Sequence, residues 1–139
     1  MRFWDSSAIV LLCVEQPASA AARTLVQGDP HVVAWWASLV ECWSAFARLR
    51  RESRIDLDGE DTARSRLRAL QESWSEIRPS EDIRMQTARL LRVHPLRAHD
   101  ALQLAAALTW AGSPPSGEIV AFDHTLREAA RLEGLTPLP

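Results

Sequence analysis

The sequence has no lysine, so all 16 of its basic side chains are arginines. It has no CxxC pair and no HExxH segment, and it therefore gives no support for a zinc site. No apolar run approaches the ~18 residues that a membrane-spanning helix needs, so we expect no membrane association. The net charge is only −2. Attraction of a polyanion would therefore have to come from a local arginine patch or a bound metal ion.

The only two cysteines, Cys13 and Cys42, fall in apolar segments that we predict to be helical. We expect them to be free, buried thiols in a reducing compartment rather than a disulfide or a nucleophile. The apolar segment 8–14, followed by small residues at 18–20, imitates a signal peptide. It has only the minimum length, however, and Asp5 cancels the charge of Arg2. The expected location is the cytoplasm.

Length and composition predict one globular domain over residues 1–139, because 47% of the residues are hydrophobic and 24% are charged. Apolar periodicity and helix-capping residues predict strands at about 2–4, 31–35, 77–78, 118–122 and 135–138. Helices are predicted at about 6–15, 18–26, 38–54, 58–76, 81–93, 97–111 and 124–132, with Asp58 capping the fourth. Short strands separated by helices indicate a parallel sheet covered on both faces. The predicted fold is a helix-rich, three-layer α/β/α domain.

Four acidic residues fall at positions that this architecture brings to one edge of the sheet. Asp5 and Asp123 each end a predicted strand, and Glu41 and Asp100 each lie in the first turn of a predicted helix. Ligands of open parallel sheets bind beyond the carboxyl ends of the strands, where helix starts also lie. We therefore expect the four carboxylates to converge in one cleft.

Clustered carboxylates repel one another, and burying them without partners is costly. A hard divalent cation removes that penalty, and Mg²⁺ accepts carboxylate oxygens together with water and phosphate. Such an ion can activate a water molecule and neutralise charge while a phosphodiester is attacked. The constellation thus favours a Mg²⁺ or Mn²⁺ site for nucleic-acid hydrolysis.

Each acid also has a purely structural alternative. Asp5 and Asp123 could simply cap the helices that follow them. Glu41 closes a capping-box pattern that begins at Ser38, and Asp100 could only complement a helix dipole.

The sequence resembles the PIN-domain family, specifically VapC-type toxins of toxin–antitoxin modules. The matching segments are FWDSSAIV (3–10), SLVECWSA (38–45) with Arg48, LRAHDALQLAAA (96–107), and VAFD (120–123) with Leu126, Ala129, Ala130 and Gly134. Each segment alone is weak, but the four occur in the family's order and spacing over nearly the whole chain.

The resemblance implies a PIN-like fold and a metal-dependent endoribonuclease that uses Mg²⁺ or Mn²⁺. The family's catalytic and metal-binding acids fall on Asp5, Glu41, Asp100 and Asp123. Ser6 falls where the family often has a hydroxyl beside the first aspartate, and the resemblance implies a catalytic role for it in orienting a metal-bound water or a phosphate. The resemblance also implies a homodimer and a cognate VapB-type antitoxin whose C-terminal segment lies across the active site. His124 departs from the family, which often has a basic residue directly after the last aspartate.

Other residues have structural and functional interpretations side by side. The arginines at 48, 50, 51 and 54 and at 64, 66 and 68 could contact RNA, but a solvated face with pairs such as Glu60–Arg64 is favoured. The six tryptophans are better explained by core packing or a dimer face than by base stacking, least firmly at Trp35, Trp36 and Trp74. Neither His99 nor His124 is expected to bind the metal, since neighbours on a helix point about 100° apart.

Two rival functions follow from the same residues. A non-catalytic PIN-like module would bind RNA or protein alone, but the intact set of four acids argues against it. A phosphatase of similar fold would be expected to carry an Asp-x-Asp pair at the first strand end, where this chain has Ser6 and Ser7 after the aspartate.

Overall fold

The computed structural model describes all residues, 1–139, and contains one parallel sheet. Its strands are β1 (Arg2–Trp4), β2 (Val32–Trp35), β3 (Ser75–Ile77), β4 (Glu118–Val120) and β5 (Thr136–Leu138). Their order across the sheet is β3-β2-β1-β4-β5, so the first strand of the chain is the central one.

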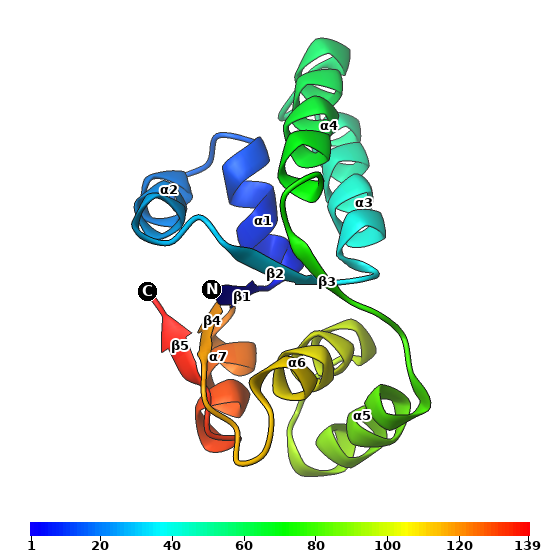
Figure 1. Cartoon of the computed structure of the whole chain (residues 1–139). Coiled ribbons are helices and arrows are strands. Elements are labelled where there is room, and N and C mark those ends of the chain that lie inside the picture. The colour runs from blue at the N-terminus through cyan, green and yellow to red at the C-terminus, as the bar shows by residue number, and fades with distance from the viewer.

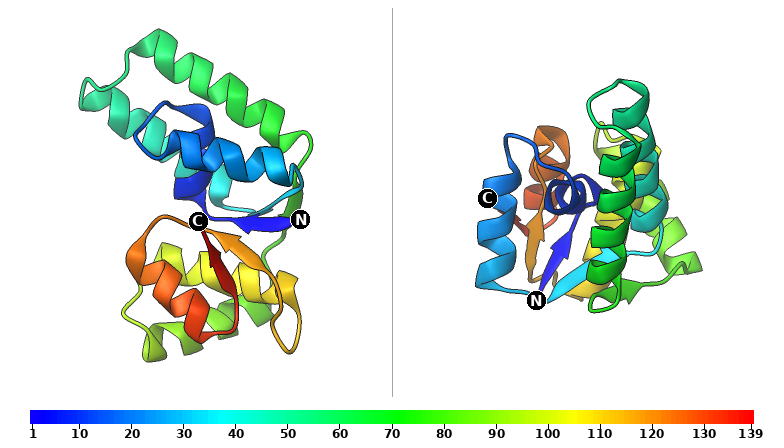
Figure 2. Two further views of the ribbon diagram at one scale, coloured as in Figure 1. Left: turned by 90° about the vertical axis from the view of Figure 1, so that its left-hand side faces the viewer. Right: turned by 90° about the horizontal axis from the view of Figure 1, so that it is seen from above.

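Helices cover both faces of this sheet. They are α1 (Ser6–Cys13), α2 (Ser19–Gly28), α3 (Ser38–Arg51), α4 (Leu57–Gln71), α5 (Glu81–Val93), α6 (Ala98–Ala111) and α7 (His124–Leu132). Figure 1 shows α1–α4 above the sheet and α5–α7 below it, and the turned view in Figure 2 shows the same three layers. The predicted three-layer α/β/α architecture is therefore confirmed, and no helix is long and apolar enough to cross a membrane.

Successive side chains of the central strands alternate between two hydrophobic cores, one on each face of the sheet. Phe3 packs in the cluster shared with α5–α7, whereas Trp4 packs in the cluster shared with α1–α4, and both side chains are fully buried. In β2, Val33 and Trp35 face the first of these clusters and Val32 the second. Because successive side chains of a strand point to opposite faces, a strand buried on both sides reads as an unbroken apolar run.

The start of α4 differs from the prediction. Asp56, not Asp58, is the N-cap: its backbone is extended, and its carboxylate accepts a hydrogen bond from the Gly59 N–H at 2.8 Å. Asp58 lies in the first turn instead, where a negative charge complements the helix dipole. The helix also ends at Gln71, before the predicted 76, because residues 75–77 pair with β2 as strand β3.

The arginine-rich hairpin of α3 and α4 is held by an acid in its interior. Glu60 is only 6% exposed, and its carboxylate lies 2.8 Å from Arg50 Nε and 3.3 Å from Arg64 Nε. Part of the arginine cluster thus forms structural ion pairs, as the favoured interpretation predicted.

The burial of the cysteines and tryptophans agrees only in part with the sequence-based expectation. Cys13 and Cys42 are both buried and free, as predicted. Trp4 is buried, and so is Trp35, for which burial was predicted less firmly. Trp43 is 40% exposed on α3, and the Arg64 guanidinium lies over its ring.

Candidate active site

The strand order reverses between β1 and β4, and this reversal opens a crevice at their carboxyl ends. From β1 the chain enters α1 on one face, and from β4 it enters α7 on the other (Figure 1). The Asp5 N–H donates to the Val120 carbonyl at 3.0 Å, which fixes the two strand ends side by side. Parallel sheets bind their ligands at such a switch point.

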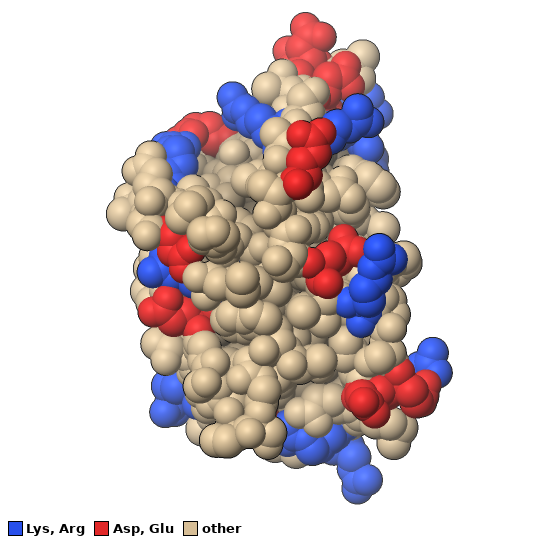
Figure 3. Space-filling view, viewed as in Figure 1, with Lys and Arg blue, Asp and Glu red and all other residues tan.

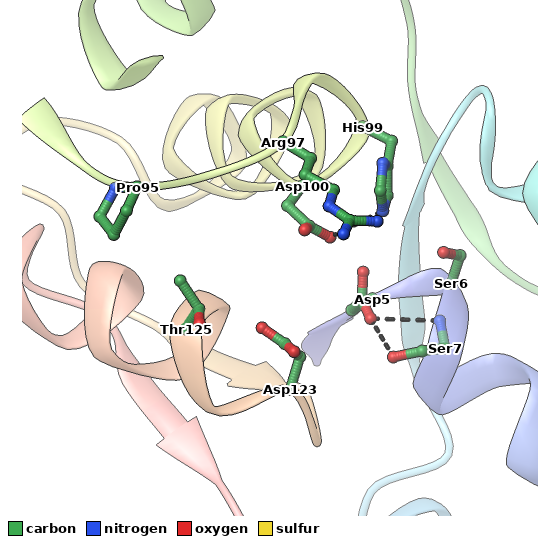
Figure 4. Close-up of a pocket in the computed structure, with 9 residues that line it drawn as sticks. All are labelled: Asp5, Ser6, Ser7, Pro95, Arg97, His99, Asp100, Asp123 and Thr125. Atoms are coloured by element: carbon green, nitrogen blue, oxygen red, sulfur yellow. Dashed lines mark hydrogen bonds and ion pairs between the residues drawn. The ribbon is translucent and has the colours of Figure 1, made fainter. Parts of the chain in front are cut away.

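A pocket of about 480 Å³ occupies this crevice, and apart from Pro95 its lining residues are polar or charged. Its lining residues are Asp5, Ser6, Ser7, Pro95, Arg97, His99, Asp100, Asp123 and Thr125. In Figure 4, Asp5 and Asp123 project from the ends of β1 and β4, and Asp100 faces them from the start of α6. The structure thus brings three of the four predicted acids to one pocket.

The fourth predicted acid, Glu41, lines an adjoining pocket of about 430 Å³. That pocket is lined by Ser6, Ser7, Val10, Val40, Glu41, Ser44, Ala45, Arg48 and His99. Ser6, Ser7 and His99 belong to both linings, so the two pockets lie side by side. We call their union the acidic groove.

Hydrogen bonds from two other elements orient the Glu41 carboxylate. The Ser6 hydroxyl donates to its Oε2 at 2.5 Å, and the Gln103 amide donates to the same atom at 3.2 Å. The capping-box alternative for Glu41 is wrong, because the N-cap of α3 is Ala37, not Ser38, and no side chain caps this helix start. Gln103 was missed by sequence reasoning, although it lies one helical turn after Asp100, a spacing that places two side chains on one face.

Asp5 serves the helix and the pocket at once. Its carboxylate accepts hydrogen bonds from the Ser7 N–H at 3.1 Å and from the Ser7 hydroxyl, so it is the N-cap of α1. The residue is only 3% exposed. Burial raises the pKa of Asp5 to about 6, and the charges of Glu41 and Asp100 add to the rise while the Ser7 hydrogen bonds oppose it.

Asp100 and Asp123 differ in their surroundings. The Asp100 side chain is 21% exposed, and its pKa is raised mainly by burial and further by the charge of Asp123, against His99 and Arg97. Asp123 caps α7, since its Oδ2 accepts from the Leu126 N–H at 2.8 Å. Asp5 and Asp123 therefore each cap a helix, as the structural alternative predicted, and also line the pocket.

The His99 side chain lies beside Asp100, whereas helix geometry alone predicts that neighbouring side chains point about 100° apart. Its Nε2 lies 3.3 Å from Asp100 Oδ1. Both side chains line the same pocket (Figure 4).

The donor set fits an open Mg²⁺ or Mn²⁺ site rather than a closed cage. No three His, Cys, Asp or Glu side chains lie close enough together to hold a metal ion by themselves. Mg²⁺, however, keeps several waters and uses only one or two carboxylates together with phosphate. The pocket also sets three carboxylates against one guanidinium, so a divalent cation balances its charge. The assignment of Asp5, Glu41, Asp100 and Asp123 as metal ligands stays a prediction.

These features define a parallel α/β domain with an acidic pocket at its switch point. No protein-family model and no curated protein matches the sequence. Solved structures do match. VapC20 of Mycobacterium tuberculosis, a sarcin-ricin loop cleaving toxin, is 19% identical over 93% of this chain and 95% of that chain, with a TM-score of 0.70.

Two further structures agree with this match. FitAcB of Neisseria gonorrhoeae is 14% identical over 100% of this chain and 97% of that one, with a TM-score of 0.69. A toxin–antitoxin complex from Klebsiella pneumoniae is 15% identical over 98% and 96%, with a TM-score of 0.68. The structural neighbours are thus PIN-domain toxins of toxin–antitoxin modules, and this chain has their fold.

The raised pKa of Asp5 predicts how pH affects the protein without metal. Its folded-state pKa of about 6 exceeds the ordinary value of 3.8, so the folded state holds this proton more tightly. The free energy of unfolding should therefore fall by up to about 3 kcal/mol between about pH 4 and pH 7. Urea unfolding in EDTA across this range measures the fall. Asp5→Asn, which keeps a capping side chain, should flatten the profile, and an equally steep profile in this variant would contradict the assignment.

Asp100→Ala should leave the fold intact and leave the melting temperature without metal unchanged or higher. The substitution removes a charge that Asp5 and Asp123 repel. Differential scanning calorimetry in EDTA measures the shift. Asp82→Ala is the matched control, since Asp82 also lies in a first helical turn but outside the acidic groove, and its loss should lower the melting temperature slightly. A clear fall for Asp100→Ala would contradict the repulsion argument.

Proposed function

We propose that this protein is a metal-dependent endoribonuclease toxin that hydrolyses RNA phosphodiester bonds and is neutralised by a cognate VapB-type antitoxin. One observation carries the proposal. Three carboxylates that make no ion pair with arginine share a polar pocket at the switch point of a fold that RNA-cleaving toxins also have. Cytoplasmic location stays a prediction.

In this proposal Asp5, Glu41, Asp100 and Asp123 hold Mg²⁺ or Mn²⁺. When bound, the ion supplies an activated water and neutralises charge on the attacked phosphate. Ser6 is a positioning residue, because its hydroxyl holds the Glu41 carboxylate toward the groove at 2.5 Å. The Ser7 hydrogen bonds fix the Asp5 carboxylate in the same way from the first turn of α1.

The proposal includes an antitoxin and a homodimer as partners. Among the structural neighbours is a toxin–antitoxin complex. On this chain Val40 and Trp43, one turn apart on α3, and Trp36, in the turn just before α3, are 40–55% exposed. Apolar and aromatic side chains gathered on one helix face are typical of the core of a protein–protein interface. Val40 also lines the Glu41 pocket, so a partner seated here would reach the acidic groove.

Cleavage of RNA tests the enzyme directly. Purified protein should cleave labelled RNA with Mg²⁺ or Mn²⁺ and not with EDTA. Asp5→Asn and Asp100→Asn should each lower the rate by on the order of a hundredfold or more, comparable to the loss of one transition-state contact. Asp82→Asn, outside the groove, should retain full activity.

Three outcomes would count against this proposal. Cleavage that persists in EDTA, or in the Asp5→Asn or Asp100→Asn variant, would contradict the proposed metal site. Absence of cleavage of any RNA, with intact antitoxin binding, would favour the non-catalytic binding module. Release of phosphate from small phosphomonoesters without RNA cleavage would favour a phosphatase.

A further inference from the structure

The arginines divide into those that have partners within the chain and those that have none. Of the 16 arginines, ten form an ion pair with a carboxylate or donate a hydrogen bond to a backbone carbonyl. The six that have no such side-chain partner are Arg48, Arg51, Arg54, Arg68, Arg92 and Arg97. The visible face in Figure 3 accordingly shows blue and red interspersed, with no large block of either sign.

Two of these six arginines line the acidic groove, one in each pocket. Arg97, the N-cap residue of α6, lines the three-aspartate pocket, and Arg48, in the last turns of α3, lines the Glu41 pocket. Both residues are exposed. Ser6, Ser7 and His99, which join the pockets, therefore lie between the parts of the groove that hold the two guanidinium groups.

The absence of ion pairs at these two arginines is informative because carboxylates are close by. Arg97 is near enough for its charge to oppose the rise in the pKa of Asp100, yet it forms no ion pair with that residue. In Figure 4 its guanidinium projects into the same space as Asp100 and His99. A guanidinium left free in this way keeps its planar set of donors for phosphate oxygens, which it binds with two parallel hydrogen bonds.

We propose that Arg48 and Arg97 bind phosphates of one RNA strand that lies along the acidic groove, on either side of the phosphate that is cleaved. This inference rests on the proposed function and names how its substrate is held. The carboxylates and their metal act on the central phosphate, and the two arginines fix the register of the strand by binding its neighbours. Phosphate contacts of this kind position a nucleic acid without reading its sequence.

The salt dependence of RNA binding tests this proposal. A short fluorescein-labelled single-stranded RNA is titrated with protein by fluorescence anisotropy, with Ca²⁺ in place of Mg²⁺ and a gel to verify that the strand stays intact. For single strands the slope of log K against log salt changes by about 0.7 for each phosphate contact. Arg48→Gln and Arg97→Gln should each lower the slope by about that amount, and the double variant by about 1.4.

Arg92→Gln is the matched control, because Arg92 is also exposed and unpaired but lies on α5, outside the groove. It should leave the slope unchanged. A second readout separates phosphate binding from damage to the site. Without RNA, Arg97→Gln should bind Mn²⁺ as tightly as the wild type or more tightly, since it removes a positive charge beside Asp100. Damage to the fold would weaken both Mn²⁺ and RNA binding.

The outcomes distinguish this inference from the function on which it rests. Wild-type slopes in Arg48→Gln and Arg97→Gln, together with metal-dependent cleavage by the wild type, would overturn the inference and leave the nuclease intact. Wild-type protein that neither binds nor cleaves RNA would overturn both. A reduced slope in both variants with retained Mn²⁺ affinity supports the phosphate sites.

Discussion

The structure depends on crowded negative charge at one edge of its sheet. Asp5 is 3% exposed, ends the central strand and caps α1, so it cannot move away from the other acids without loosening the helix. Asp123 is fixed in the same way between β4 and α7. Two helix caps are thus held side by side by the Asp5–Val120 hydrogen bond, at the position where a parallel sheet leaves room for a ligand. The folding of the two strand ends creates a repulsion between carboxylates that the proposed cation would relieve.

The carboxylates are restrained by bonds that come from both layers. Ser6 on α1 and Gln103 on α6 donate to one oxygen of Glu41, and α1 and α6 lie on opposite faces of the sheet (Figure 2). Gln103 is fully buried and also donates to Ser38 at 3.1 Å, which ties α6 to the start of α3. Buried neutral donors thus hold this half-buried carboxylate in one orientation at the groove. The layers are therefore connected at the site as well as through their apolar cores.

The sequence predicted most of the fold and the acids of the pocket for the same reason. Buried strands that end in aspartate are visible as apolar runs, and topology brings the ends of parallel strands together whatever the side chains do. Sequence reasoning failed where two neighbouring residues could each cap a helix. Asp56 and Asp58 are equally good N-cap residues by type, and the structure selects Asp56, whose backbone is extended. Sequence reasoning also missed Gln103 and the separate pocket of Glu41, because both depend on how α3 and α6 approach each other across the sheet edge.

The charges that line the groove would also couple the binding of a cation to the binding of a phosphate strand. Without a cation, four carboxylates outnumber two arginines there, and a phosphate chain would be repelled as much as it was held. A divalent ion would cancel this excess, so that a phosphate strand would meet no net negative charge and the two guanidinium groups could attract it locally. Under the proposed function, metal and RNA would raise each other's affinity by the same factor, because coupling between two ligands is reciprocal. A protein of net charge −2 can in this way hold a polyanion with a local arrangement that its overall composition does not reveal.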